Sequence, residues 1–587
     1  MTTPDDPGRI SQEGFQLTVC RAPACRLFLW ALFSVAAWGL WSLLGREVAL
    51  PDIPDARFQC LSYTPFRGDQ SPFDAGLIVP AENVRADLAL LAPHTGCVRT
   101  YSTRMGVDAV LPAARQYGLK LLLGIWIGRE VKDNKLEIES TLSTAALHPQ
   151  SVRAIIVGNE VLLRKEQSAQ GLIAIIEDVR RQTTLPLTYA DVWEFWLKNP
   201  EVAAHVDFLT IHILPYWEDQ PVAVEGSLQH VDKILSEIQA AFPGKAILIG
   251  ETGWPSAGRG RETATPGRVN QARFVREFVA LTGKKGIPYN LIEAFDQPWK
   301  RFQEGTVGGQ WGLFSADRQA KFPLTGPVSE HPSWRWLVIA GSLLSALVLA
   351  VTWRRPLAGW RWFALAACGH AGVGVVYFYV RQLAHAAITW PDWLFGLAGD
   401  AIILLALLLL GIILIAPGSR WATTVPPDLL RTRAWLLGRL PPGMSLDPPE
   451  RLWGLLRGLT LISAAVMALP LAADGRYREF PIAFFLAPAL LLWHHPPAGR
   501  QPLEAWLGGM LALCIPLGLA VETLANREAL AWNGVLLLLV IPLRRVMLLE
   551  WHHLTKRTGE GGNPDSYSTA TRASKPPINP TAPPRAL

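Results

Sequence analysis

Cysteine and charge are both scarce in this chain. Only 6 of its 587 residues are Cys, and they are scattered, with no CxxC pair and no metal-ligand spacing. This pattern argues against a zinc site and against a fold held together by disulfides. The sequence also contains no GxGxxG segment and no Walker loop, the short motifs that bind nucleotide phosphates. We therefore predict no metal and no cofactor.

The positive net charge does not indicate a nucleic-acid partner. Charged residues make up 18% of the chain and the net charge is +6. Outside residues 55–330, most Lys and Arg lie beside apolar segments, where they set the orientation of membrane spans. Apolar residues are abundant instead: half of the residues are hydrophobic, 24 are Trp, and the mean hydropathy is +0.20. Residues 55–330 have the composition of a soluble domain, whereas apolar runs dominate 331–553.

Residues 27–45 carry no charge and reach the length of about 20 residues that spans a bilayer. A cleavable signal peptide is the alternative, but the run is long for one and no small-x-small cleavage site follows it. We predict an uncleaved transmembrane anchor. Further apolar runs follow at 335–353, 362–380, 394–416, 458–473, 480–493, 503–521 and 530–543. The region 334–553 is thus predicted to be an all-α membrane region with about seven further spans.

Arginines next to these runs predict the orientation in the membrane. They precede the first run (Arg21, Arg26) and follow the second (Arg354, Arg355) and the last (Arg544, Arg545). The loop after the fourth run carries six more, namely Arg420, Arg431, Arg433, Arg439, Arg451 and Arg457. Because positive loops stay inside, we predict a cytoplasmic tail at 1–26 and an external domain at 56–330. The Pro-, Ser-, Thr- and Gly-rich segment 554–587 is predicted to be a disordered cytoplasmic tail.

The external domain alternates strand-like runs with helical patterns such as 225–241 and 268–282. Its strand-like runs lie at 58–63, 97–101, 119–126, 153–158, 185–190, 207–213, 246–250 and 288–295. Eight strands joined by crossover helices over about 270 residues predict an α/β fold, a (β/α)8 TIM barrel. In such a barrel the chemistry sits at the carboxyl ends of the strands.

Two of these strands end on a glutamate. The run AIIVG (154–158) leads into Asn159 and Glu160, and AILIG (246–250) leads into Glu251. Two carboxylates at one barrel rim are what glycoside cleavage requires, since one donates a proton to the leaving oxygen and the other attacks the anomeric carbon or activates water. A neighbouring amide such as Asn159 can bind the 2-hydroxyl of the sugar. The two glutamates end the fourth and the seventh predicted strands. This arrangement favours a catalytic role over the alternative that both residues are simply solvated at strand ends.

The motifs VGNEV (157–161) and GETGWPS (250–256) resemble those of glycoside hydrolase family 17, the β-1,3-glucanases and related transglycosylases. Three supporting segments are VRTYS (98–102), EAFDQPWK (293–300) and WGLF (311–314), and the resemblance covers about 56–326. It implies that Glu160 is the acid/base and Glu251 the nucleophile, with retention of configuration. The strand TIHILPYW (210–217) departs from the plant enzymes, because His212 stands near the usual Asn.

Other polar and aromatic residues are expected to line the substrate site. Arg99 would keep Glu251 ionised, Tyr216 would hydrogen-bond it, and Tyr101 would share the side of the strand that Arg99 faces. The remaining candidates for substrate binding are Tyr63, Asn159, His212, Trp217, Trp254, Glu293, Asp296, Trp299, Lys300 and Trp311. If Tyr63 and Arg99 point inward, Cys60 points outward and Cys97 inward, so we expect free thiols there.

The membrane region resembles that of bacterial inner-membrane family members, including rhizobial β-1,6-glucan synthases. The resemblance implies a multi-pass inner-membrane protein with a periplasmic catalytic domain, acting on β-glucan, and a glucan synthase in the membrane as a candidate partner. No acidic cluster suits a nucleotide-sugar donor, so new linkages would draw on existing glycosidic bonds. The first hypothesis is a retaining β-1,3-glucan transglycosylase that elongates or makes β-1,6 branches. Alternatives are an endo- or exo-β-1,3-glucanase and a non-catalytic glucan-binding or export component.

Overall fold

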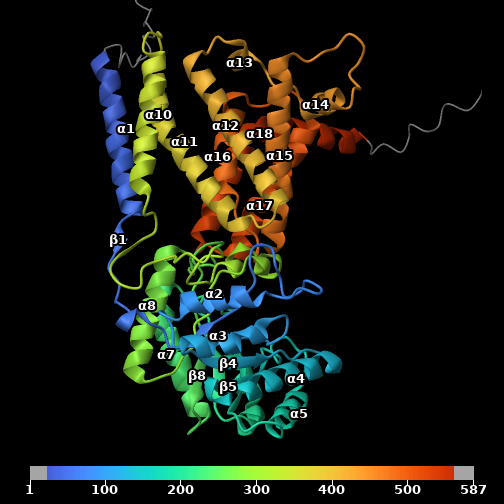
Figure 1. The fold of residues 1–587 in the computed structure, drawn as a ribbon. Helices are drawn as coiled ribbons and strands as arrows, with labels where there is room; N and C mark the ends of the chain where they lie inside the picture. The colour runs from blue at the N-terminus through green and yellow to red at the C-terminus, as the bar shows by residue number, and fades with distance from the viewer. Residues whose placement is uncertain (1–22, 561–587) are drawn as a thin grey trace, which may run out of the picture.

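A computed structural model describes residues 23–560, and it has a barrel at one end and a helical region at the other (Figure 1). The segments 1–22 and 561–587, which hold most of the two predicted tails, lie outside the described residues. The chain enters the barrel after α1 (Pro23–Leu44) and leaves it before α10 (Trp334–Thr352). Next to these helices β1 (Glu47–Val48) pairs antiparallel with β9 (Val328–Ser329), so the two connections run side by side.

Seven parallel strands form the described sheet of the barrel, in the order β2 to β8. They are β2 (Leu61–Ser62), β3 (Cys97–Arg99), β4 (Lys120–Ile125), β5 (Val152–Asn159), β6 (Leu187–Val192), β7 (Leu209–His212) and β8 (Ile247–Glu251). Successive side chains of β5 alternate, with Ala154 and Ile156 in the inner apolar cluster and Ile155 and Val157 in the outer core. This period of two is the reason that an unbroken apolar run can be a strand buried on both faces.

The eighth predicted strand, 288–295, closes the barrel without forming a regular strand. Tyr289 bridges Ile249 of β8, and Leu291 bridges Leu61 of β2, both in parallel. The Leu291 amide donates to the Cys60 carbonyl at 3.0 Å. The (β/α)8 prediction is therefore confirmed as a nearly closed TIM-like barrel with an irregular last strand.

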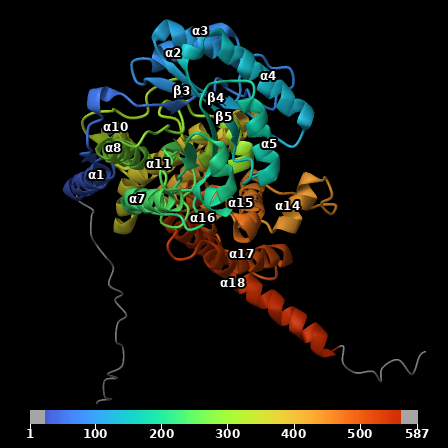
Figure 2. The same ribbon diagram turned by 90° about the horizontal axis from the view of Figure 1, so that it is seen from below.

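Helices cover the outside of the barrel (Figures 1 and 2). The longer ones are α2 (Ala81–Leu91), α3 (Val110–Tyr117), α4 (Val131–Leu147), α5 (Ala169–Arg180), α7 (Val224–Ala241) and α8 (Arg268–Lys285). Shorter ones are α6 (Trp193–Lys198) and α9 (Arg301–Glu304). The amphipathic pattern places these helices: α7, for example, buries Val231, Ile234, Leu235 and Ile238 on one face.

The prediction that Cys60 and Cys97 are free thiols is wrong, because they form a disulfide inside the barrel. The prediction assumed that Tyr63 points inward with Arg99. Tyr63 instead points outward and donates its hydroxyl to Asp87 of α2 at 3.1 Å. Since Tyr63 and Cys60 are three residues apart, Cys60 then faces the inside, beside Cys97 on the neighbouring strand. The same orientation keeps Tyr63 away from the barrel mouth.

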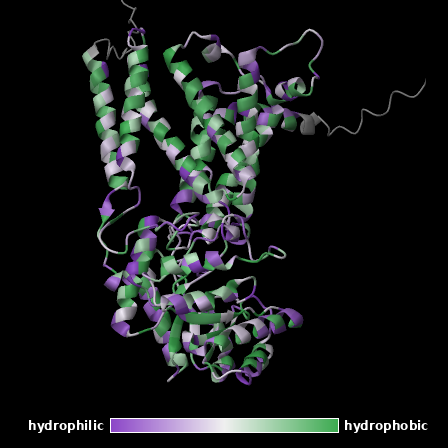
Figure 3. Cartoon of the chain, viewed as in Figure 1, coloured by the Kyte–Doolittle hydropathy of each residue, from purple (hydrophilic) through white to green (hydrophobic). Residues whose placement is uncertain are grey.

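The helical region follows the predicted apolar runs, and hydrophobic residues predominate along its helices (Figure 3), many of them exposed. Its helices are α10, α11 (Gly359–Ala386), α12 (Trp390–Ile415), α13 (Arg420–Thr423), α14 (Leu429–Leu436), α15 (Pro448–Asp474), α16 (Ile482–His494), α17 (Pro502–Glu522) and α18 (Arg527–Glu560). Within residues 23–560, seven helices, α1 included, are long and apolar enough to cross a membrane. The run 480–493 forms α16, which has only 13 residues.

Candidate active site

The turn that ends β5 presents Glu160. Gly158 has φ +87°, and a Cβ at this position would lie 2.7 Å from Val161 Cγ2, so glycine is required. Glu160 itself has φ +52°, an uncommon conformation for a residue with a side chain. The register with β6 also shifts between Ile156 and Asn159. Such irregularities re-aim side chains at the end of a strand, and here they leave the Glu160 side chain 23% exposed.

Glu251 ends β8 and is almost fully buried. Arg99 Nη1 lies 3.1 Å from its carboxylate, and the Tyr101 hydroxyl donates to the same oxygen at 2.8 Å. Arg99 also donates to the Asn159 side-chain oxygen, which ties the ends of β5 and β8 together. Burial alone would raise the pKa of Glu251, but His212, Arg99 and the Tyr101 hydroxyl together hold it below its usual range. Glu251 is thus kept ionised, as predicted for Arg99.

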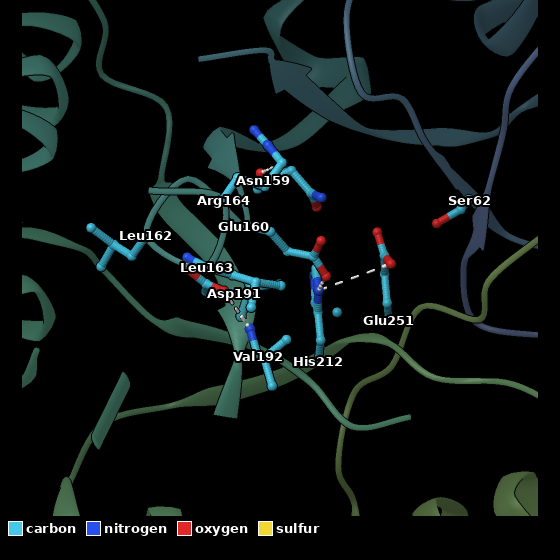
Figure 4. Close-up of polar contacts among 12 residues, drawn as sticks. Ser62, Asn159, Glu160, Leu162, Leu163, Arg164, Asp191, Val192, His212 and Glu251 are labelled. Carbon is cyan, nitrogen blue, oxygen red and sulfur yellow. Dashed lines mark hydrogen bonds and ion pairs between the residues drawn. The ribbon is translucent and has the colours of Figure 1, made fainter. Parts of the chain in front are cut away.

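His212, at the end of β7, lies between the two glutamates (Figure 4). Its Nδ1 is 2.9 Å from Glu160 Oε1 and 3.9 Å from Glu251 Oε2. One oxygen of each carboxylate and a ring nitrogen all lie within 4.8 Å of one another. Carboxyl groups about 5–5.5 Å apart are typical of retaining glycosidases, whereas inverting enzymes separate them by about 6.5–9.5 Å. The same three groups could hold a metal ion by distance, although Glu251 already accepts hydrogen bonds from Arg99 and Tyr101.

Comparison with known proteins places this barrel among glycoside hydrolases. The family model of the BtgE/BtgC glycoside hydrolase domain matches residues 60–312. The glucan 1,3-beta-glucosidase of Schizosaccharomyces pombe is 30% identical over 264 residues, covering 41% of this chain and 79% of that protein. The chain belongs to glycoside hydrolase family 17.

Two further members illustrate the extent of the likeness. The glucan 1,3-beta-glucosidase of Arthroderma benhamiae is 28% identical over 253 residues, covering 40% of this chain and 82% of that protein. The crystal structure of the family 17 beta-1,3-glucanosyltransferase from Rhizomucor miehei is 24% identical, covers 46% of this chain and 98% of its own, and superposes with a TM-score of 0.41. Residues 60–312, which the family model matches, correspond to the barrel.

Asp191 is an acidic residue near Glu160 that was not among the predicted site residues. Asp191, near the end of β6, accepts hydrogen bonds from the Tyr189 hydroxyl and, at 2.8 Å, from the Val192 amide. Burial raises the pKa of Asp191 to about 6, and the Glu160 charge contributes to the increase. Asp191 lies just beyond the predicted strand 185–190, and no motif marks it. Its position at the carboxyl end of a strand next to that of Glu160 was the available signal.

Glu293 lies within the closing segment 288–295, and Asp296 and Lys300 follow it. Lys300 Nζ is 2.8 Å from Glu293, which is 1% exposed. Burial raises the pKa of Glu293 to about 7, because desolvation outweighs the effect of the Lys300 ammonium. Asp296 instead pairs with Lys321 at 2.6 Å and accepts the Gly312 amide at 2.8 Å, contacts that fix the backbone. The Lys300 ammonium also lowers the pKa of Glu251, and the charge of Glu251 adds to the raised pKa of Glu293.

The prediction that Tyr216 hydrogen-bonds Glu251 is wrong, since its hydroxyl donates to the Arg259 carbonyl and Tyr101 occupies the predicted position. Among the four predicted Trp platforms, Trp254 and Trp311 are buried, at 0% and 2% exposure, and pack against Tyr216. This burial leaves no free face for a sugar on either ring.

Trp217 and Trp299 are partly exposed and remain candidate sugar platforms. Trp126, which the sequence analysis missed, is 38% exposed directly after β4, and the Arg164 guanidinium lies 4.3 Å from its ring centre. Trp126 is thus a third candidate. The position of Trp126 at the end of a strand could have indicated a role at the barrel mouth. Because Trp126 belongs to the apolar run 119–126, that run was interpreted only as a strand.

Proposed function

We propose that this chain is a membrane-anchored, retaining β-glucan transglycosylase that acts on β-1,3-glucan. The names of its relatives, glucan 1,3-beta-glucosidases and a beta-1,3-glucanosyltransferase, support the substrate class. The observation that carries the proposal is the close approach of Glu160 and Glu251 around His212, with carboxylate oxygens within 4.8 Å. Such a separation leaves no room for a water on the far side of the sugar, and so favours a covalent intermediate.

In the first step the Glu251 carboxylate attacks the anomeric carbon of the donor. Glu160 gives its proton to the departing glycosidic oxygen, so the bond to the leaving sugar breaks and a glycosyl ester with Glu251 forms. The contacts of Glu251 with Arg99 and Tyr101 support the nucleophile role, because a carboxylate attacks only when ionised. The partly exposed Glu160 is positioned to exchange protons with substrate and solvent.

In the second step Glu160, now a carboxylate, takes a proton from a hydroxyl of the acceptor glucan. The freed oxygen attacks the anomeric carbon and releases Glu251. Each step inverts the configuration at the anomeric carbon, so the two steps together retain it. Asn159, held by Arg99 and next to Glu160 in the chain, is placed to bind the 2-hydroxyl of the same sugar unit.

In a transfer reaction the acceptor sugar must outcompete water, which is present at about 55 M. A bound acceptor can do so, because a well-oriented reacting group has an effective molarity of about 10⁵ M or more. Trp217 and Trp299 are the partly exposed platforms that would hold an acceptor. The alternative is a β-1,3-glucanase with water as acceptor, which the glucosidase names of several relatives favour. A non-catalytic glucan-binding or export role is less well supported, because both glutamates are present and held.

Incubation of the full chain with laminari-oligosaccharides, followed by mass and linkage analysis, distinguishes these functions. Products longer than the substrate, or branched ones, support transglycosylation. Free glucose and shorter oligosaccharides alone, at millimolar acceptor, indicate the glucanase. If an oligosaccharide binds but no product forms, the non-catalytic role is supported. The Glu251→Gln variant is the control and measures the background of product formation.

We also propose that the helical region is embedded in a bacterial inner membrane with the barrel on the periplasmic side. The short helices α13 and α14, with Arg420, Arg431 and Arg433, lie at the end of the helical region that is opposite the barrel (Figure 1). Arg354 and Arg355 follow α10, which runs away from the barrel. The positive-inside tendency would make that end cytoplasmic.

A further inference from the structure

A loop of the helical region reaches the mouth of the barrel. Residues 475–481 connect α15 to α16 and contact the barrel segment 305–306. Gly305 has φ +72°, and a Cβ there would collide with the backbone of Tyr477. The two backbones approach this closely only because residue 305 is glycine.

Hydrogen bonds of the two residues that follow Tyr477 hold this loop in place. The Arg478 carbonyl accepts a hydrogen bond from Arg259 at 3.0 Å, and Arg259 belongs to the barrel loop after β8. Glu479 accepts a hydrogen bond from Gln382 of α11 at 2.9 Å. The loop is thus fastened both to the barrel and to the membrane helices, and Tyr477 is carried on a fixed backbone.

The Tyr477 side chain joins an aromatic and basic group on the barrel. Its ring centre is 6.2 Å from that of Trp217, and Trp217 stacks on Trp311 at 6.3 Å. The Arg261 guanidinium lies 5.3 Å from the Trp217 ring centre, and that of Arg476 lies 5.6 Å from the Tyr477 ring centre. Trp311 is buried, but Tyr477 remains 43% exposed, so its ring presents surface to a ligand.

This group lies on loops that begin at two catalytic strands. Trp217 is five residues beyond His212, and Arg261 is ten beyond Glu251. The Arg261 Nη1 donates to the Tyr216 carbonyl at 2.7 Å, which orients the guanidinium next to Trp217. A polymer bound across the two glutamates would therefore meet these side chains as it leaves the barrel mouth.

The chemistry of the group suits a neutral polysaccharide. An aromatic face covers the apolar face of a pyranose, and guanidinium N–H groups donate to its hydroxyls. We propose that Tyr477, with Trp217, Arg261 and Arg476, forms a distal glucan-binding subsite, to which the membrane region contributes a loop. The inference rests on the proposed function and assigns the membrane region a direct role in substrate binding. Long glucans should reach this subsite, and short ones should not.

The test compares binding of two laminari-oligosaccharides to the full chain in detergent by calorimetry. Glu251→Gln serves as the parent, so that the ligand is not consumed, and a trisaccharide and a heptasaccharide are titrated. Adding Tyr477→Ala should weaken heptasaccharide binding about tenfold, the effect of losing one stacked ring, and leave trisaccharide binding unchanged. Tyr477→Phe keeps the ring and should bind like the parent.

A second variant does not depend on loop packing. The Arg476 side chain is exposed, so Arg476→Gln should fold normally and weaken only the heptasaccharide, by about threefold, the effect of one hydrogen bond. Equal heptasaccharide affinities for parent, Tyr477→Ala and Arg476→Gln would overturn the subsite while leaving the proposed function intact. An equal loss for both oligosaccharides would show a structural role for Tyr477 and also overturn it. Failure of the parent to bind either oligosaccharide would remove the proposed function itself, and the subsite with it.

Discussion

Tyr101 donates its hydroxyl proton to Glu251 across 2.8 Å, from a strand end that also carries Arg99. Tyr101 was predicted to lie near the substrate, and the hydrogen bond to Glu251 was predicted for Tyr216. The actual donor lies two residues beyond Arg99, the last residue of β3. One short segment, VRTYS, therefore supplies both the charge and the hydrogen bond that hold Glu251 ionised.

Replacing Tyr101 by Phe should move the acid limb of the pH profile. The hydrogen bond lowers the pKa of Glu251, so its loss raises that pKa and protonates the nucleophile at a higher pH. The acid limb of kcat/KM should shift upward by about one pH unit, the effect of one hydrogen bond to a charged group. Ser62, the other partner of Tyr101 at 3.2 Å, is the control: Ser62→Ala should leave the limb in place. An unmoved limb in Tyr101→Phe would show that this bond does not tune Glu251.

The two glutamates should fail differently when replaced. Glu251→Gln removes the nucleophile and should reduce both transfer and hydrolysis to background with every donor. Glu160→Gln should cost about 10²–10⁴ with natural glucans but far less with a glycosyl fluoride, whose leaving group needs little protonation. Rates with the two donors for both variants check this, and the opposite ranking would reverse the assigned roles.

The buried disulfide should contribute to the stability of the barrel. Cys60 and Cys97 enclose a loop with a sequence separation of 37, for which cross-linking is worth about 3–4 kcal/mol. The double variant Cys60→Ala/Cys97→Ala should therefore unfold at a temperature several degrees lower, as measured on the purified full chain. The free Cys368 provides the control, since Cys368→Ala breaks no bond. Equal melting temperatures for the two variants would show that the bond does not stabilise the fold.

Arg259 should be critical for the junction between the barrel and the membrane helices. It is 4% exposed, pairs with Glu522 of α17, and donates to the Arg478 carbonyl. Arg259→Met leaves Glu522 as a buried, unpaired carboxylate, which typically costs about 3–5 kcal/mol. Adding Glu522→Leu should restore most of the loss, because the pair is then replaced by apolar contacts.

Thermal unfolding of the single and double variants provides the measurement. Arg273→Gln breaks an ion pair whose Glu225 partner is 69% exposed, and should change stability by less than about 1 kcal/mol. If Arg259→Met behaves like Arg273→Gln, the junction does not depend on this pair.

The proposed topology predicts where fused reporters will be active. A phosphatase that works only outside the cytoplasm should be active when fused after residue 330, between β9 and α10, and inactive when fused after residue 440, between α14 and α15. A fluorescent protein that folds only in the cytoplasm should give the reverse. Activity of the phosphatase at 440 alone would invert the orientation.

Much of the fold was predictable because its signals are local. Apolar runs of about 20 residues predict membrane helices whatever surrounds them, and all eight runs correspond to helices in the structure. The alternation of strands and helices predicted the barrel, and the ends of two strands predicted where Glu160 and Glu251 lie. These positions follow from chain direction alone, because parallel strands all end at the same rim.

Side-chain direction and inter-element contacts were not predictable in the same way. The Tyr63 side chain points outward to Asp87 of α2. Because Tyr63 was predicted to point inward, the predicted direction of Cys60 was also reversed. Likewise, Trp254 and Trp311 were predicted to be exposed sugar platforms, whereas in the structure both are buried against Tyr216.

The sequence by itself determined the class of the barrel, the apolar helices, the two glutamates at the strand ends and the family, since each depends on a pattern within a short segment. Only the tertiary structure decided that Tyr101 bonds Glu251, that His212 lies between the glutamates, and that Tyr477 meets Trp217. Those contacts join residues that are 150, 52 and 260 positions apart. No local pattern specifies such a contact, because it depends on how whole elements pack and on which way each side chain points once they have packed.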